Sequence, residues 1–139
     1  MMSKSNRIPK VIVADDDAEM RSLIATALRR QRCEVIETKN GFEMLDELCS
    51  GLFDAKAEAP ADLIISDLRM PGVTGMSLLA GLRSAGWNTP FILITAYGGA
   101  EVHLEAFRHG ADACVDKPFD IDHLRRVAVS VLAAAGVEI

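Results

Sequence analysis

Five short apolar runs recur along this chain of 139 residues and constrain its fold more than any other feature. The runs are residues 11–14, 35–36, 63–65, 91–94 and 113–115. Three of them are continuous and rich in branched side chains, which is typical of strands buried on both faces of a parallel sheet. Successive runs start roughly 22 to 29 residues apart, a span typical of units made of one strand and one helix.

Amphipathic helices are predicted between the runs, because apolar residues there recur at helical spacing. Clear patterns lie at residues 20–28, 76–82 and 121–132, and weaker ones lie at 41–49 and 100–109. Asp17 is placed to cap the first helix. We interpret residues 50–60 as a surface loop before the third strand. The alternation predicts an α/β fold with a parallel sheet covered by helices on both faces.

Composition narrows the class of protein further. The length fits one ordinary domain, and a hydrophobic half with a charged quarter excludes a disordered chain. The net charge of −5 argues against direct binding of nucleic acid or an anionic membrane. No apolar run approaches the roughly 20 residues of a membrane span, and the polar residues 1–10 lack a signal core. We therefore expect a cytoplasmic protein.

Polar side chains follow four of the five runs, and the carboxyl ends of parallel strands meet at one edge of a sheet. They are Asp15, Asp16 and Asp17 after the first run, Ser66 and Asp67 after the third, Thr95 after the fourth, and Asp116 and Lys117 after the fifth. Crowded carboxylates repel one another unless a cation lies among them, and hard oxygen ligands favour Mg²⁺. A carboxylate beside such an ion can act as a nucleophile toward phosphorus, with Lys117 and Thr95 neutralising the phosphoryl charge.

An ordered set of motifs carries a family resemblance over about residues 8–134. The set comprises the acidic run from Asp15, the D-x-x-M-P-G motif from Asp67, Thr95-Ala96 and Lys117-Pro118-Phe119. Together they resemble the receiver domain of two-component response regulators. The resemblance implies a single receiver domain over residues 1–139, with a flavodoxin-like doubly wound (βα)5 fold and strand order 2-1-3-4-5.

The resemblance also implies roles for particular residues. Asp67 would accept a phosphoryl group from the phosphohistidine of a sensor histidine kinase or a histidine phosphotransfer protein. Mg²⁺ would be bound by Asp16, by Asp67 and by the backbone carbonyl of Arg69, with Asp15 acting mainly through water. Thr95 would bond a phosphoryl oxygen, and Lys117 would pair with the acyl phosphate. A cis peptide bond is expected before Pro118.

The same resemblance implies a signalling role rather than that of an enzyme. Self-catalysed phosphotransfer and autodephosphorylation are the expected reactions. The surface formed by the last two helices and the last strand would pass the signal to an output domain or a downstream protein, and phosphorylation could drive a homodimer. The sequence leaves open whether an output domain belongs to the same protein.

One position departs from the family pattern. Receivers usually carry Tyr or Phe three residues before the lysine, where this chain has Cys114. A small side chain cannot fill and vacate the cavity of an aromatic ring, so the usual readout would be altered. Tyr97 lies near the expected site and is a candidate substitute. Core packing is the simpler interpretation of Cys114.

Two other functions stay open. A phosphatase of the haloacid dehalogenase type would use Asp-x-Asp after the first strand, a spacing that Asp15 and Asp17 satisfy, although Glu19 stands where that motif has Thr or Val. A receiver-like protein-interaction module would act without phosphorylation. Nucleotide binding is disfavoured, because neither G-x-x-x-x-G-K-[ST] nor G-x-G-x-x-G occurs.

Overall fold

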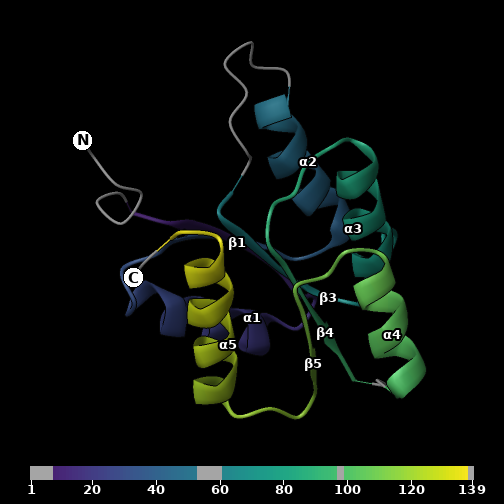
Figure 1. Ribbon diagram of the computed structural model, residues 1–139. Helices are drawn as coiled ribbons and strands as arrows, with labels where there is room; N and C mark the ends of the chain where they lie inside the picture. Colours follow the sequence, from purple (N-terminus) through teal and green to yellow (C-terminus); the bar gives the residue numbers. More distant parts are fainter. Residues whose placement is uncertain (1–7, 53–60, 97–98, 138–139) are drawn as a thin grey trace.

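The computed structural model describes residues 8–52, 61–96 and 99–137, which form one parallel sheet flanked by helices (Figure 1). The sheet has five strands in the order β2-β1-β3-β4-β5. The strands are β1 (Lys10–Ala14), β2 (Glu34–Thr38), β3 (Leu63–Asp67), β4 (Phe91–Thr95) and β5 (Ala113–Asp116). This confirms the flavodoxin-like order, whose reversal between β1 and β3 creates a crevice at the carboxyl edge.

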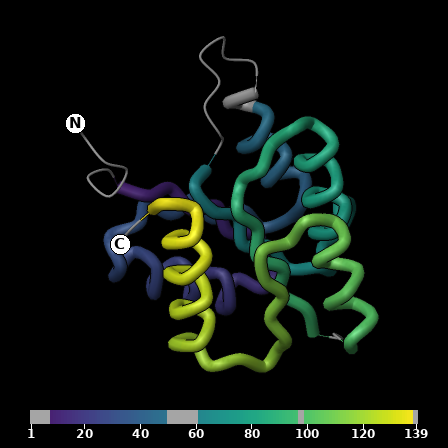
Figure 2. The backbone as a smooth tube through the Cα atoms, viewed as in Figure 1, coloured from purple at the N-terminus to yellow at the C-terminus, as the bar shows by residue number. Residues whose placement is uncertain are grey.

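Five helices cover the two faces of the sheet. They are α1 (Ala18–Arg29), α2 (Gly41–Leu52), α3 (Gly75–Ser84), α4 (Ala100–Arg108) and α5 (Ile121–Ala134). Helices α1 and α5 lie side by side on one face, and α2, α3 and α4 cover the other (Figures 1 and 2). Among the described residues, no helix is both long and apolar enough to cross a membrane.

Two apolar cores form because successive strand residues point to opposite faces. In β1, Val11 and Val13 join the core under α1 and α5, whereas Ile12 joins the core under α2, α3 and α4. All five residues of β3 and of β4 are buried, as their continuous apolar runs predict. The residues at the carboxyl ends of the central strands therefore lie within the packed interior.

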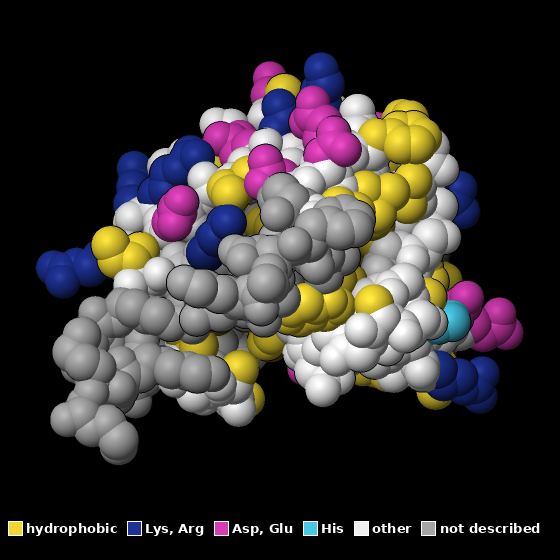
Figure 3. Space-filling view, turned by 90° about the horizontal axis from the view of Figure 1, so that it is seen from above, with side chains coloured by type: hydrophobic (Ala, Val, Ile, Leu, Met, Phe, Trp, Pro, Cys, Tyr) yellow, Lys and Arg dark blue, Asp and Glu magenta, His cyan; other side chains and the backbone are white. Residues whose placement is uncertain are grey.

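Surface charge is mixed on the face that Figure 3 shows. Basic and acidic side chains are interspersed there, with hydrophobic side chains between and beside them. The described residues that are visible on this face therefore form no patch of a single charge sign.

Local sequence signals explain most of the helix ends. Asp17 caps α1 as predicted, because its side chain accepts the backbone N–H groups of Glu19 and Met20 at 3.0 and 3.3 Å. One boundary was wrong: we expected a loop over residues 50–60, but α2 continues to Leu52. Ser50 and Gly51 do not by themselves end a helix. Residues 53–60 lie outside the described residues.

Replacing each of the two glycines of α3 by alanine should change stability in opposite directions. A Cβ at Gly75 would meet the carbonyl oxygen of Asp67 at 2.4 Å, whereas a Cβ at Gly81 would meet nothing within 4 Å. Gly75→Ala is expected to lower the free energy of unfolding by about 1–3 kcal/mol, because α3 must move away from β3. Gly81→Ala should raise it by about 0.5–1 kcal/mol, since alanine suits a helix interior. Urea unfolding of both variants checks this pair; equal effects would contradict it.

Candidate functional site

Four strands deliver polar side chains to the carboxyl edge of the sheet. Asp67 and Thr95 are the last residues of β3 and β4, and Lys117 directly follows β5. Asp15 and Asp16 directly follow β1. We expected Ser66, Asp67, Thr95 and Asp116 to follow their apolar runs as loop residues, but they belong to the ends of β3, β4 and β5. The structure thus brings together side chains that lie up to 102 positions apart in the chain.

Three carboxylates form the centre of the site. One carboxylate oxygen from each of Asp15, Asp16 and Asp67 lies within 4.8 Å of the others, and Asp15 and Asp67 are buried whereas Asp16 is exposed. With the Lys117 ammonium, these groups carry a net charge of −2, three negative charges less one positive. An oxygen-rich site of this charge, open on one side, fits a small divalent cation such as Mg²⁺ that keeps part of its water.

Lys117 joins two of these carboxylates. Its Nζ donates to Asp67 Oδ2 at 3.0 Å and lies 3.5 Å from Asp15 Oδ2. Burial alone would lower the pKa of the Lys117 ammonium, but the hydrogen bond to Asp67 and the charges of Asp15 and Asp67 outweigh burial and raise it. Lys117 therefore stays charged at neutral pH. The peptide bond between Lys117 and Pro118 is cis, as expected.

Asp15 is held in a fixed orientation. Its Oδ1 accepts the backbone N–H of Asp17 at 2.9 Å, and its carbonyl oxygen accepts Arg21 Nη1 at 2.8 Å. Burial raises the pKa of the Asp15 carboxyl, and the charge of Asp67 adds to this, against the lowering by Asp17 N–H and Lys117. Arg21 was not among the predicted site residues, and a single arginine six residues past the first aspartate does not reveal this contact in the sequence.

Backbone hydrogen bonds fix the chain next to Asp67 and Thr95. Leu68 N–H donates to the Ile94 carbonyl at 2.7 Å, and Lys117 N–H donates to the Thr95 carbonyl at 2.7 Å. The backbone N–H of Arg69 points to Asp67 Oδ1 at 3.4 Å. The Thr95 side chain is buried at the same edge. Metal ligation by the Arg69 carbonyl stays a prediction.

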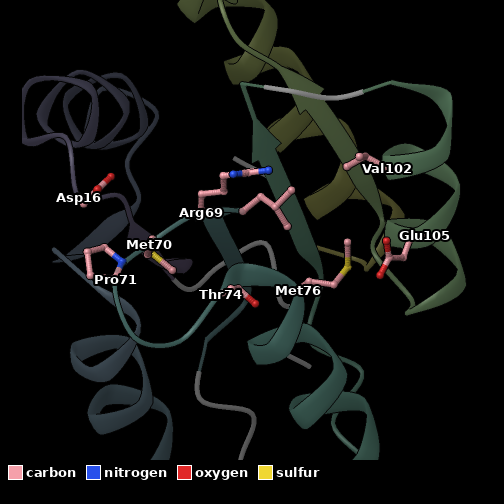
Figure 4. A pocket seen from close by; sticks show the side chains of 9 residues that line it. Asp16, Arg69, Met70, Pro71, Thr74, Met76, Val102 and Glu105 are labelled. Carbon is pink, nitrogen blue, oxygen red and sulfur yellow. The ribbon is translucent and has the colours of Figure 1, made fainter.

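A cavity of about 700 Å³ opens beside the acidic cluster. Asp16 and Arg69 lie on one side of it, and Val102 and Glu105 of α4 lie on the other (Figure 4). The remaining lining is largely apolar and includes Met76. The cavity leaves Asp16, and with it the open side of the cluster, accessible from solvent.

Cys114 points toward the α4 side of β5. It is half-buried and packs against the core under α2, α3 and α4, in agreement with the packing interpretation. Burial raises the pKa of the Cys114 thiol to about 11, and the charge of Asp116 contributes. Tyr97, the candidate substitute for the missing aromatic, lies outside the described residues.

The rate of thiol alkylation tests whether Cys114 is packed as the structure describes. Burial also raises the pKa of the Cys33 thiol to about 11, with a contribution from the charge of Asp62. At pH 8, Cys33 and Cys114 should react with iodoacetamide at least about 100-fold more slowly than a free thiol, because little thiolate is present. Mass spectrometry of timed, folded samples measures these rates. Rapid alkylation of Cys114 would show that β5 is not packed as described.

Comparisons with known proteins agree with this geometry. The family model described as the response regulator receiver domain matches residues 11–129. Regulatory protein AtoC of Escherichia coli (strain K12) is 35% identical over 125 residues, 90% of this chain and 25% of AtoC. Sporulation initiation phosphotransferase F of Bacillus subtilis (strain 168) is 29% identical over 116 residues, 84% of this chain and 87% of that protein.

The fold is also similar to that of a solved receiver domain. The receiver domain of the Francisella response regulator 1452 superposes with a TM-score of 0.78 at 33% identity, covering 91% of this chain and 98% of that one. The chain spans about a quarter of the length of several curated relatives that it matches.

Proposed function

This chain belongs to the response regulator receiver domain family of two-component systems, and we propose that it accepts a phosphoryl group on Asp67 in a Mg²⁺-dependent reaction. One observation carries the proposal: the Asp67 carboxylate lies in a cluster with Asp15 and Asp16, 3.0 Å from the Lys117 ammonium. A nucleophile, an acidic ion site and a fixed cation thus lie together.

The chemistry is a transfer of the phosphoryl group from nitrogen to oxygen. A carboxylate oxygen of Asp67 forms a bond to phosphorus while the bond to the donor's imidazole nitrogen breaks, and the freed imidazole takes up a proton from solvent. Asp15, Asp16, Asp67 and the Arg69 carbonyl are the proposed Mg²⁺ ligands, Asp15 mainly through water. When bound, Mg²⁺ would neutralise charge on the phosphoryl oxygens.

Lys117 and Thr95 are proposed to stabilise the transferred group. The Lys117 ammonium already contacts Asp67 and keeps its charge at neutral pH, so it can pair with phosphoryl oxygen without reorganisation. Thr95 is buried at the end of the neighbouring strand, where its hydroxyl could donate to another phosphoryl oxygen. Catalysis by such a site consists mainly of positioning and charge neutralisation.

The proposed donor is a sensor histidine kinase or a histidine phosphotransfer protein in the cytoplasm. The proposed output surface comprises α4, β5 and α5, and it would contact an output domain, a downstream protein or a second phosphorylated copy. Relatives such as AtoC are about four times longer than the matched region, which supports an output domain in related proteins. We also propose that residues 1–139 form one receiver domain.

Incubation with acetyl phosphate and Mg²⁺ tests the function. Intact-mass spectrometry should show one added phosphoryl group per chain, and a chelator added beforehand should prevent the gain. Asp67→Asn should show none, while Asp112→Asn, which changes a carboxylate at the opposite edge of the sheet, should be labelled like the wild type. A wild-type protein that gains no phosphoryl group would favour a module that acts without phosphorylation.

A further inference from the structure

A polar contact joins α4 to the end of β5. His103 Nε2 of α4 lies 2.8 Å from Asp116 Oδ1, the last residue of β5. The two residues are 13 positions apart, so the contact links two separate elements. The sequence gives no sign of it, because His103 lacks any metal-ligand or catalytic spacing.

Asp116 lies between two residues of the proposed phosphorylation site. It directly precedes Lys117, and it pairs with Thr95 across β4 and β5. The next residue continues this connection, since Lys117 N–H donates to the Thr95 carbonyl at 2.7 Å. Any displacement of Thr95 or Lys117 toward a bound phosphoryl group therefore acts on the backbone of Asp116.

The apolar packing between α4 and β5 involves small side chains, Ala106 of α4 and Cys114 of β5, which belong to the same core. Within α4, all of whose residues are described, Ala106 is the buried one, while Leu104 and Phe107 are about half exposed. On β5, Cys114 and Asp116 point to the same side because they are two residues apart in a strand. Cys114 is small, and among the described residues the His103–Asp116 contact, which lies at the surface, is the side-chain hydrogen bond between these elements.

We propose that His103 and Asp116 form the link through which the state of Asp67 determines the position of α4. The proposal rests on the proposed function, since it assigns the route by which phosphorylation would reach the output surface. Asp116 moves with Lys117 and Thr95, and His103 transmits this movement to α4 through a bond that apolar packing does not replace. His103 and Asp116 are thus positioning residues and have no part in the phosphotransfer itself.

Amide hydrogen exchange of the full chain tests the link. Exchange of residues 100–108 is measured with and without Mg²⁺ plus beryllofluoride, which imitates a phosphoryl group on aspartate. The wild type should show a change in α4 of at least about threefold, and His103→Ala should reduce that change to less than half. Asp116→Ala should act alike, and the double variant should lose no more than either single variant.

Two further variants separate a link from a general effect on α4. His103→Gln keeps a side-chain N–H donor and should restore much of the response. His109→Ala changes the histidine that directly follows α4, whose Nε2 lies 3.9 Å from Oε1 of Glu105, and should respond like the wild type. If His103→Ala does not fold, Asp116→Asn, which removes the charge and keeps the shape, takes its place with a smaller loss expected.

The outcomes distinguish this link from the proposed function. The link would be overturned if hydrogen exchange in α4 of His103→Ala changed with beryllofluoride as much as in the wild type. It would also be overturned if exchange in the wild type did not change. Labelling of Asp67 by acetyl phosphate is measured on the same samples, and we expect all variants to be labelled. Absence of labelling in the wild type would instead overturn the proposed function.

Discussion

Replacing Lys117 by Met lowers the rate of Asp67 phosphorylation by about 100-fold or more, because the fixed cation that pairs with phosphoryl oxygen is lost. Lys117 Nζ lies 3.0 Å from Asp67 Oδ2, and methionine fills similar space without charge. The rate is measured with acetyl phosphate and saturating Mg²⁺ by intact mass. Lys39→Met is the matched control, because Lys39 is exposed and pairs with Glu43 at 3.8 Å.

The same variant should bind Mg²⁺ more tightly than the wild type. Loss of the ammonium takes the charge of the four-group cluster from −2 to −3, so the carboxylates attract a divalent cation more strongly. Calorimetric titration measures the affinity. A cooperative urea unfolding curve of Lys117→Met serves as the control that the variant is folded. Faster phosphorylation of this folded variant, or weaker Mg²⁺ binding by it, would contradict the assigned role of Lys117.

Replacing Asp15 by Asn stabilises the metal-free protein at neutral pH and weakens Mg²⁺ binding at least about tenfold. The Asp15 carboxyl is 1% exposed, and burial raises its pKa even though Lys117 lies nearby. Its net environment therefore disfavours the charged form, and a neutral side chain of the same shape should raise the free energy of unfolding.

The pH dependence follows from the direction of this pKa shift. The folded state binds the Asp15 proton more tightly than the unfolded state does, so this group lowers stability as pH rises from the unfolded value of 3.8 through the folded pKa. Above that range the penalty is constant, and Asn removes it. Lys117 acts oppositely at alkaline pH: its raised pKa contributes stability below 10.5 that is lost as pH rises through the folded pKa.

Urea unfolding in EDTA at pH 5 and pH 8 measures these effects. The stability difference between Asp15→Asn and the wild type should be larger at pH 8. Asp16→Asn is the control, because Asp16 is exposed: it should weaken Mg²⁺ binding and leave metal-free stability nearly unchanged. A destabilised Asp15→Asn protein at pH 8 would show that the buried charge is better compensated than we infer.

Apolar periodicity was sufficient to predict the layers of this fold. The continuous runs of β3 and β4 became strands buried at every residue, and the spacing between runs left room for one helix each. Periodicity contains no information about which strands are neighbours. The order 2-1-3-4-5 followed from the resemblance and is confirmed.

The acidic cluster was predictable for a similar reason. Residues that end parallel strands must meet at one edge, so Asp15, Asp67 and Lys117 could be brought together without coordinates. Contacts between a helix face and a strand depend on the rotation of the helix and on side-chain rotamers. The contact between His103 and Asp116 could therefore not be predicted from the sequence. The same holds for the hydrogen bond from Arg21 to the Asp15 carbonyl oxygen.

Helix ends were less predictable where several signals competed. The capping of α1 by Asp17 depends on one short-range geometry, and the sequence predicts it well. Small residues after Cys49 suggested a loop, but the hydrogen-bonded helix runs on to Leu52. The close approach of α3 to β3 at Gly75 is a tertiary contact that no local pattern reveals.

Locating the phosphoryl group on the chain shows whether Asp67 is the residue that accepts it. After incubation with acetyl phosphate and Mg²⁺, borohydride reduction converts a phosphorylated aspartate to homoserine, which peptide sequencing by mass spectrometry can place. We predict homoserine at position 67 and at no other aspartate. Homoserine at position 15 would instead identify the nucleophile of a phosphatase-like site, and it would contradict the role of Asp67 on which the account depends.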